Sequence, residues 1–305
     1  MSALLSARVR VPCSTSNLGS GFDTLGLALD RYLTAHFEPG GSELDVERTG
    51  TLHRLDEEDV GRDFLVATFI DHVTAAGGGP PRGLLKVHSE IPVARGLGSS
   101  AAALVAGHDL ARAALGMASD PQASFRYGLS REGHGDNAAP CALGGFRAVV
   151  PGADGPRPLS LELSGDVGFA YAAPAAGVST VAARTALPRD VSHGVAVAEL
   201  GRLAALLRGM AVADPELVRV GVEDELHVPH RLPLIPGAYN AIGAGYDAGA
   251  WGVTISGSGS GLIAITSPDD AVEVARAMRE VFSAGADDPD CVGFALSPDF
   301  EGVSR

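Results

Sequence analysis

The sequence predicts an α+β fold with helices packed against mixed sheets, because strand-like and helix-like segments follow one another along the chain. With 305 residues, of which 46% are hydrophobic and 20% are charged, the chain is long enough for two domains. The loop Pro151–Pro158 (PGADGPRP) is the best candidate boundary, since Gly and Pro interrupt regular structure. We therefore expect an N-terminal domain over residues 1–155 and a C-terminal domain over residues 156–305.

The first half of the chain contains both strand and helix patterns. The polar segment Gly40–Asp63 is typical of a hairpin and a connection. A helix is expected over Phe64–Ala76, because the breaker cluster GGGPP follows it. The other expected elements are a strand over Ala7–Pro12, an apolar stretch over Thr24–Leu33, a strand over Gly83–Ile91, helices over Ala101–Leu115 and Pro121–Glu132, and a strand over Gly144–Val150.

The second half has the element order of an αβ sandwich, because its strand-like segments are separated by longer helical ones. The expected strands are Val167–Ala172, Gly252–Ile255 and Gly261–Thr266, and the expected helices are Val195–Met210, Ala238–Ala248 and Asp270–Ser283.

Composition restricts the cellular setting and the partners. The formal net charge of −14 argues against a nucleic acid or an anionic membrane as a partner. No apolar run is long enough for a transmembrane helix, and the N-terminus lacks the apolar core of a signal peptide. Cys13, Cys141 and Cys291 lie far apart without C-x-x-C spacing. We expect reduced thiols and a cytoplasmic protein.

The most informative stretch is Pro92–Ala102 (PVARGLGSSAA), which connects an expected strand to an expected helix. A glycine-rich turn before a helix presents unpaired N–H groups and the positive end of the helix dipole, and this geometry binds phosphate. The two serines add hydroxyls for a phosphate oxygen or a metal. The stretch has neither the Walker A lysine nor the dinucleotide fingerprint. Taken alone, it fits an ordinary serine-capped connection equally well.

Other segments accompany this loop in a fixed order. They are PCSTSNLGSGFDTLGLAL at 12–29, EGHGDNAAPCALGG at 132–145, STVAARTALP at 179–188, LHVPHRLPLIPG at 226–237 and GVTISGSGSG at 252–261. Together with the loop they resemble the GHMP small-molecule kinases, over nearly the whole chain. The resemblance implies a two-domain fold, with an N-terminal nucleotide-binding α+β domain and a C-terminal ferredoxin-like αβ sandwich. It also implies ATP and Mg²⁺ as cofactors, bound in the cleft between the domains.

The blocks at 179–188 and 226–237 resemble the branch of this family that phosphorylates the hydroxyl of L-homoserine in threonine biosynthesis. The resemblance implies that Glu132 is the magnesium carboxylate and that Ser100 is the hydroxyl on the metal side. The ATP-binding residues that it implies are Pro92, Val93, Ala94, Arg95, Gly96, Leu97, Gly98, Ser99, Ser100, Ala101 and Ala102.

The resemblance also assigns the substrate pocket. Arg184 and Arg231 match the two substrate arginines, and the planar fork of arginine suits a carboxylate. Asp23 fits the substrate ammonium. The matched set is completed by Asn17, His134 and Asp136. For Asp136, an Asx turn that shapes the loop is an equal alternative to substrate contact.

A catalytic base is missing from the matched positions. Asn137 stands where this branch of the family has Asn and where many related kinases have a catalytic Asp. The single lysine, Lys86, lies in another segment. Because a side-chain amide accepts no proton at neutral pH, the acceptor proton is expected to pass to the γ-phosphate. Asn137, Thr180 and Arg184 would then position the reactants and stabilise charge.

Several positions depart from the family pattern. Ala94 replaces a glycine, Gly135 replaces a proline, and residues 258–261 read SGSG. Phe64 stands where many relatives have an asparagine near the nucleobase; we expect it to pack in the core, with stacking on the base as the alternative. Two other functions stay open: a GHMP kinase for a sugar, a mevalonate-like alcohol or shikimate, and a non-catalytic ligand-binding protein of this fold. The sequence leaves the oligomeric state open, a homodimer being one option.

Overall fold

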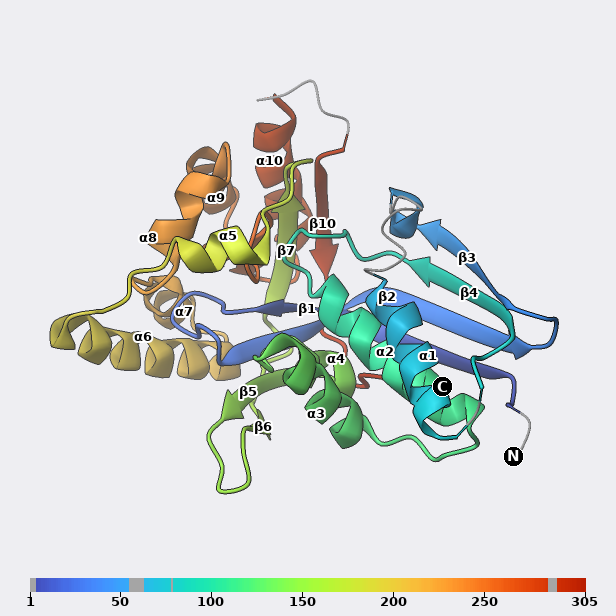
Figure 1. Ribbon diagram of the computed structural model, residues 1–305. Helices are drawn as coiled ribbons and strands as arrows, with labels where there is room; N and C mark the ends of the chain where they lie inside the picture. The colour runs from blue at the N-terminus through green and yellow to red at the C-terminus, as the bar shows by residue number, and fades with distance from the viewer. Residues whose placement is uncertain (1–3, 55–62, 78, 285–289) are drawn as a thin grey trace.

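The structure, a computed structural model, describes residues 4–54, 63–77, 79–284 and 290–305 (Figure 1). Within these residues the first sheet has six strands, in the order β3-β4-β2-β5-β6 with β1 also paired with β2. Its strands are β1 (Ala7–Ser16), β2 (Leu25–Pro39), β3 (Leu44–Gly50), β4 (Gly83–Ser89), β5 (Phe146–Val150) and β6 (Arg157–Ser160).

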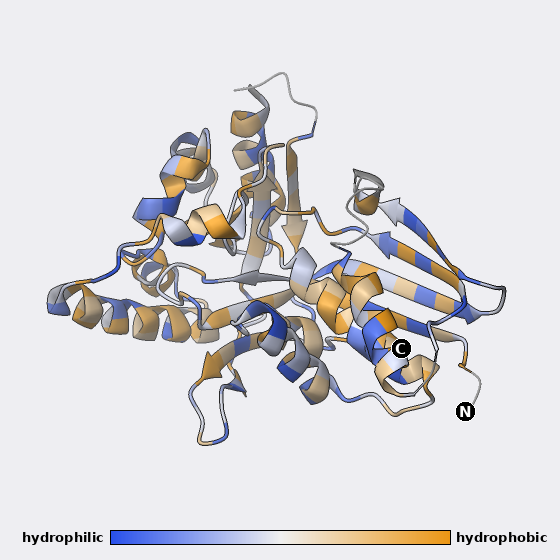
Figure 2. Ribbon diagram, in the orientation of Figure 1, coloured by the Kyte–Doolittle hydropathy of each residue, from blue (hydrophilic) through white to orange (hydrophobic). Residues whose placement is uncertain are grey.

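Strand β2 is the centre of this sheet. It pairs antiparallel with β1 along most of its length, with β4 over its C-terminal half and with β5 at its N-terminal end. Hydrophilic and hydrophobic residues alternate along β2, β3 and β4, as expected for strands with one covered face (Figure 2). In β1 the register shifts between Pro12 and Cys13, and the following residues are buried. The expected strand at the N-terminus is therefore confirmed and continues to Ser16.

The expected hairpin over Gly40–Asp63 is wrong for the residues that the structure describes. Strand β3 pairs in parallel with β4 instead. Because parallel strands need a crossover connection, the chain passes through η1 (Thr51–Arg54) and α1 (Phe64–Ala75) before it reaches β4. Residues 55–62 of the expected connection lie outside the described residues.

Two helices of the first half begin at an aspartate that caps them. Asp63 accepts a hydrogen bond from Val66 N at 3.0 Å and so caps α1. Asp120 accepts one from Ala123 N at 2.9 Å, and Pro121 occupies the first turn of its helix. The helix capped by Asp120 is α3 (Pro121–Glu132), and the other two helices that follow α1 in this half are α2 (Ser99–Ala114) and α4 (Ala138–Leu143).

The second sheet has the order β10-β7-β9-β8 and is antiparallel throughout. The path from β7 through helices to β8 and β9, and then through α10 to β10, is the β-α-β-β-α-β arrangement of ferredoxin-like folds. This confirms the expected sandwich. Its strands are β7 (Gly168–Ala173), β8 (Gly252–Ile255), β9 (Leu262–Thr266) and β10 (Val292–Leu296); its helices are α5 (Thr180–Thr185), α6 (His193–Val212), α7 (Pro215–Val222), α8 (Val228–Arg231), η3 (Leu232–Leu234), α9 (Ala238–Asp247) and α10 (Ala271–Ala284).

Both halves contribute to one hydrophobic core. Val11 and Leu97 belong to the same buried cluster as Phe169 and Tyr171 of the second sheet. After β10 the chain returns to the first sheet, where Arg10 N donates to the carbonyl oxygen of residue 304 at 2.8 Å. Strand β6 at 157–160 pairs with β5. The division of the chain between residues 155 and 156 stays a prediction.

The cysteines and the helix lengths agree with the composition. Cys13, Cys141 and Cys291 are buried and unpaired. Burial raises the pKa of the Cys141 thiol to about 12, so this thiol keeps its proton at neutral pH. In the part of the chain that the structure describes, no helix has the length and apolar character needed to cross a bilayer.

Candidate active site

A cleft of about 410 Å³ contains most of the predicted site. Its walls come from the loop after β1, the start of α2, the turn between α3 and α4, the start of α5 and the turn after β8. The predicted site residues that line it are Asn17, Asp23, Ala94, Gly96, Gly98, Ser99, Ser100, Glu132, His134, Asp136, Asn137, Thr180, Arg184 and Arg231. All residues predicted to contact the substrate or the metal therefore share one cleft, although they come from distant parts of the sequence.

The other residues of the predicted ATP loop do not line the cleft. They are Pro92, Val93, Arg95, Leu97, Ala101 and Ala102. Leu97, Ala101 and Ala102 are fully buried in the hydrophobic core. The Arg95 guanidinium donates to the carbonyl oxygen of Asp290 at 3.1 Å. These side chains thus hold the loop in place, and their contribution to a phosphate would come from the backbone.

The phosphate loop has the backbone conformation that its glycines predict. Gly96 and Gly98 have φ of 79° and 64°, in the left-handed region that favours glycine. Gly98 precedes α2 and offers no side chain to cap it, so no capping side chain covers the N–H groups of the first turn. Ala94 also has a left-handed φ, of 57°. The substituted alanine therefore keeps a glycine-like conformation at a cost of about 1 kcal/mol.

The second domain holds this loop from the other side. Ser256 Oγ donates to Gly96 O at 2.6 Å, and the Tyr171 hydroxyl donates to Arg95 O. A Cβ on Gly96 would stand 2.0 Å from Ser256 O, so only glycine fits at this contact. The helix N-terminus is thus fixed between the two sheets and open toward the cleft, which suits an anion.

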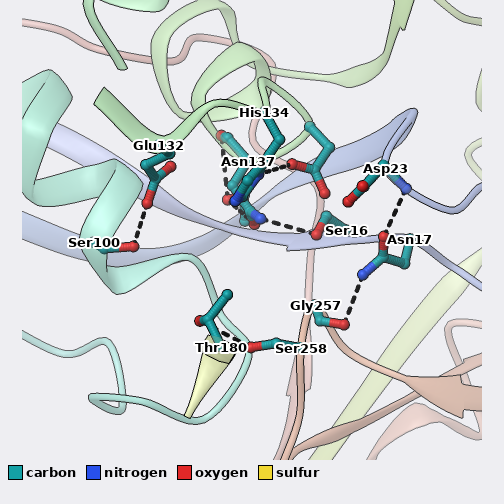
Figure 3. A network of polar contacts seen from close by, with 12 residues as sticks. Ser16, Asn17, Asp23, Ser100, Glu132, His134, Asn137, Thr180, Gly257 and Ser258 are labelled. Atoms are coloured by element: carbon teal, nitrogen blue, oxygen red, sulfur yellow. Dashed lines mark hydrogen bonds and ion pairs between the residues drawn. The ribbon is translucent and has the colours of Figure 1, made fainter. Parts of the chain in front are cut away.

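Glu132, the last residue of α3, lies beside the start of α2. Ser100 Oγ donates to Glu132 Oε1 at 2.5 Å (Figure 3), whereas Glu132 Oε2 is buried and has no hydrogen-bond partner in the part of the chain that the structure describes. Burial raises the pKa of this carboxyl above its ordinary value, against the opposing effects of Ser100 and His134. An unpartnered buried carboxylate oxygen next to a hydroxyl fits a hard cation such as Mg²⁺, which uses few protein ligands. Accordingly, the described residues contain no cluster of three or more His, Cys, Asp or Glu suited to a metal.

The turn between α3 and α4 carries a charged pair. His134 Nδ1 donates to Asp136 Oδ1 at 2.6 Å. This bond outweighs burial and raises the pKa of His134. Burial opposes ionisation of Asp136, but hydrogen bonds from His134 and Ser16 outweigh it and hold the pKa of this carboxyl below its ordinary value. Asp136 is therefore an ionised, buried carboxylate that orients His134 within the cleft.

The opposite wall is formed by two arginines and the loop after β1. The Arg184 guanidinium makes two hydrogen bonds to the Asp23 carboxylate, at 3.0 and 3.1 Å. Arg231 is 2% exposed and stacks over the Phe22 ring, with 5.1 Å from Cζ to the ring centroid. The carbonyl oxygen of Gly257 accepts hydrogen bonds from Asn17 Nδ2 and Arg231 Nη1 (at 2.6 and 3.3 Å). The two domains thus meet at this carbonyl group.

The structure shows the surroundings of two residues that depart from the family pattern, Phe64 and Gly135. Phe64 lines the cleft with 48% of its surface exposed, so the expectation that it packs in the core is wrong. It is the first residue of α1, whereas Leu65 and Val66, which follow it in the helix, are buried. A Cβ on Gly135 would stand 2.9 Å from the Phe125 ring. A side chain at this position, where relatives have a proline, therefore has little room in this protein.

Sequence reasoning missed the serines of β1 that hold Asn137. Ser14 Oγ donates to Asn137 Oδ1, and Asn137 Nδ2 donates to Ser16 Oγ, both at 2.9 Å. The available signal was the alternation of the strand, which puts Ser14 and Ser16 on the same face. Thr180 Oγ1 lies 3.4 Å from Ser258 Oγ, and this contact joins α5 to the turn after β8 (Figure 3).

Comparisons with known proteins agree with this fold and this cleft. The family model of the GHMP kinases N terminal domain matches residues 65–145, and that of the GHMP kinases C terminal domain matches residues 198–284. The chain belongs to the GHMP kinase family. Crystal structures of more distant members, such as a mevalonate kinase at 12% identity and a TM-score of 0.68, share the fold alone.

Nearer relatives are homoserine kinases. The chain is 37% identical over 276 residues to the homoserine kinase of Carboxydothermus hydrogenoformans, covering 90% of this chain and 89% of that protein. It is 40% identical over 262 residues to the homoserine kinase of Moorella thermoacetica, covering 84% and 86%. The crystal structure of homoserine kinase from Cytophaga hutchinsonii has a TM-score of 0.84 and 26% identity, covering 100% of this chain and 98% of that chain. Within the GHMP family, the chain falls in this homoserine kinase branch.

Proposed function

We propose that this enzyme transfers the γ-phosphoryl group of ATP to the side-chain hydroxyl of L-homoserine and yields ADP and O-phospho-L-homoserine for threonine biosynthesis. The observation that carries the proposal is one cleft in which an uncapped helix N-terminus, Arg184, Arg231 and Asp23 occur together. The helix terminus suits a phosphate, whereas two arginines and a carboxylate suit the two charges of an amino acid. The similarity to homoserine kinases supports the same substrate.

The substrate charges would find partners on both domains. Arg184 and Arg231 bind the carboxylate, and Asp23 binds the ammonium group. Arg184 and Asp23 form an ion pair with two hydrogen bonds. When the zwitterion binds, its carboxylate takes the place of Asp23 beside Arg184, and its ammonium group takes the place of Arg184 beside Asp23. The charges of Arg184 and Asp23 both keep a partner of opposite sign, which limits the desolvation penalty of binding. Asn17 contributes by fixing Asp23: its Oδ1 accepts from Asp23 N at 2.9 Å.

The transfer itself needs positioning more than acid–base chemistry. The homoserine hydroxyl oxygen forms a bond to the γ-phosphorus, the bond from this phosphorus to the β–γ bridging oxygen breaks, and the hydroxyl proton passes to a γ-phosphoryl oxygen. Asn137 orients the hydroxyl, since an amide accepts no proton at neutral pH. Thr180 and Arg184 hold the reactants and stabilise the charge that develops on the phosphoryl oxygens.

Ser100 and Glu132 would hold Mg²⁺, which neutralises the charge on the β- and γ-phosphates when it is bound. The unpartnered Glu132 Oε2 supports this assignment. The same proposal describes a cytoplasmic enzyme whose partners are ATP and homoserine and not nucleic acid or membrane, with a homodimer as the oligomer to test by light scattering.

A substrate panel tests the proposal. ADP release is measured in a coupled assay with L-homoserine, 3-amino-1-propanol, mevalonate, shikimate and galactose. We expect turnover with homoserine far above the rest, and little with 3-amino-1-propanol because it lacks the carboxylate that the two arginines bind. Equal or faster turnover of a sugar or mevalonate would favour another GHMP kinase, and the absence of any turnover would favour a non-catalytic binding protein.

The metal assignment has its own test. Glu132→Gln removes the charge that would face Mg²⁺, and kcat is expected to fall about 10²- to 10³-fold, as for the loss of one preorganised electrostatic contact. Glu216→Gln, which changes an exposed carboxylate in the first turn of α7, is the matched control. Protection of the fold by Mg²⁺ and ADP in thermal denaturation supplies a second readout. A Glu132→Gln enzyme with unchanged magnesium dependence would exclude this role.

A further inference from the structure

Asn137 has both ends of its amide held by the first strand. Ser14 Oγ lies 2.9 Å from Oδ1. Ser16 Oγ lies 2.9 Å from Nδ2 (Figure 3). Both serines are fully buried. A serine hydroxyl can donate or accept, so these two bonds alone fit either orientation of the amide. The orientation follows from the groups that lie beyond each serine.

On the oxygen side, the next group is a thiol. Cys141 Sγ donates to Ser14 Oγ at 3.3 Å. Because this buried thiol keeps its proton at neutral pH, Ser14 Oγ receives a hydrogen bond from it and directs its own single proton elsewhere. That proton points at Asn137, whose Oδ1 lies 2.9 Å away and whose backbone O lies 3.3 Å away. This arrangement favours the amide oxygen, at the shorter of the two distances, as the atom that faces Ser14.

On the nitrogen side, the next group is a carboxylate. Asp136 is an ionised, buried carboxylate, and the Ser16 hydroxyl contributes to the lowering of its pKa. A hydroxyl proton directed at this carboxylate leaves Ser16 Oγ as the acceptor for Asn137 Nδ2, which lies 2.9 Å away. The thiol beyond Ser14 and the carboxylate beyond Ser16 therefore favour the same orientation of the amide.

We propose that Ser14 and Ser16 are positioning residues that fix the orientation of the Asn137 amide and thereby the direction in which the substrate hydroxyl points. An amide has two acceptor lone pairs and two N–H groups, so Asn137 keeps one lone pair and one N–H after bonding both serines. A flipped amide would exchange these two and would turn the hydroxyl lone pair away from the phosphorus. The inference rests on the proposed function, in which Asn137 orients that hydroxyl.

The phosphate loop packs directly against Ser14 and Asn137. A Cβ on Gly98 would stand 2.3 Å from Ser14 Oγ and 2.9 Å from Asn137 Oδ1. The residue before the helix N-terminus thus touches the hydrogen bond that orients the amide. Ser14 does not line the cleft, whereas Asn137 and Gly98 do. An effect of Ser14 on turnover must therefore pass through a neighbour such as Asn137.

The decisive variant is Ser14→Ala. It removes the donor to Oδ1 without changing a residue of the cleft, and kcat is expected to fall roughly tenfold while the KM for homoserine stays near its normal value. Ser16→Ala is expected to act in the same direction. Thr254→Val is the matched control, because this buried hydroxyl has no hydrogen-bond partner and lies on β8, away from the cleft wall. Its kcat should match that of the unchanged enzyme.

A double-mutant cycle separates positioning from general loss of structure. If Ser14 acts through Asn137, then Ser14→Ala adds nothing to Asn137→Ala, and the two kcat effects are not additive. Additive effects, or an unchanged kcat in Ser14→Ala, would overturn the inference. Thermal denaturation checks that each variant folds. Should Ser14→Ala not fold, Cys141→Ala enters the same cycle, with a smaller fall in kcat expected because a thiol is a weak donor.

The cycle also distinguishes this inference from the proposed function. An enzyme that does not phosphorylate homoserine in the substrate panel refutes the function. An enzyme that does, and whose Asn137→Ala variant has a lowered kcat without coupling to Ser14, refutes the positioning role alone.

Discussion

Asp23→Asn separates the structural role of the Asp23–Arg184 ion pair from its role in substrate binding. Asp23 has a φ of 50°, in the left-handed region, where Asn and Asp are the best tolerated residues other than glycine. Asn therefore removes the charge without adding backbone strain, which an alanine would add. Asn also keeps an oxygen for the Arg184 guanidinium, whose two bonds to Asp23 measure 3.0 and 3.1 Å.

The two roles have different magnitudes. The side chains of Arg184 and Asp23 are 40% and 35% exposed, and solvent screens a pair this open. Its loss is expected to lower the free energy of unfolding by less than about 1 kcal/mol. The loss of the charge that receives the substrate ammonium is larger, about 1.5–3 kcal/mol for a charged hydrogen bond in a cleft. This corresponds to a rise of about 10- to 100-fold in the KM for homoserine.

Two measurements check this prediction. Urea denaturation gives the change in stability, and the coupled ADP-release assay gives the KM for homoserine and for ATP separately. We expect the ATP KM to stay unchanged, with Asp71→Asn, an exposed carboxylate on α1, as the control. A homoserine KM within twofold of the unchanged enzyme would refute the assignment of Asp23. A stability loss of several kcal/mol would refute the treatment of the pair as solvent-screened.

Three further predictions concern other parts of the molecule. Arg305→Ala should lower the free energy of unfolding by about 3 kcal/mol in urea denaturation, because among the described residues it leaves the fully buried Asp109 carboxylate with Ser119 as its one remaining side-chain donor. An effect below 1 kcal/mol would contradict this. Phe64→Ala should raise the ATP KM about five- to tenfold and leave the homoserine KM unchanged, since an aromatic face in the cleft offers stacking to a base. An ATP KM equal to that of the unchanged enzyme would rule out contact with the nucleotide. The His134–Asp136 pair should stabilise the fold most between the ordinary pKa values of 3.8 for Asp136 and 6.5 for His134. The raised pKa of His134 means that its contribution is lost as pH rises through the folded-state pKa. The lowered pKa of Asp136 means that its contribution is lost as pH falls through the folded-state pKa. The stability difference between the unchanged protein and His134→Ala, followed against pH, should be largest in this window, and a flat difference would contradict the pairing.

Much of the secondary structure follows from the sequence because its signals are local. The caps Asp63 and Asp120 and the glycine-rich loop before α2 lie within a few residues of the helices that they start. The helix over Pro121–Glu132 is confirmed at both ends. The parallel pairing of β3 with β4 was not predictable in this way, because alternation within a strand does not specify the direction of its neighbour.

The sequence alone predicted most of the residues that share the cleft and the class of chemistry expected there, since the motif segments carry the phosphate loop, the acidic residues and the two arginines at recognisable spacings. The tertiary structure decided how those side chains are paired. Asn137 is held by Ser14, 123 positions away, and Arg184 by Asp23, 161 positions away. Phe64 faces the cleft and not the core, whereas Leu65 and Val66 beside it in the chain are buried. Hydrogen-bond direction, ion pairing and exposure depend on groups that only folding brings together. For this reason the spacing of residues along the chain gives the inventory of the cleft but not the orientation of the groups in it.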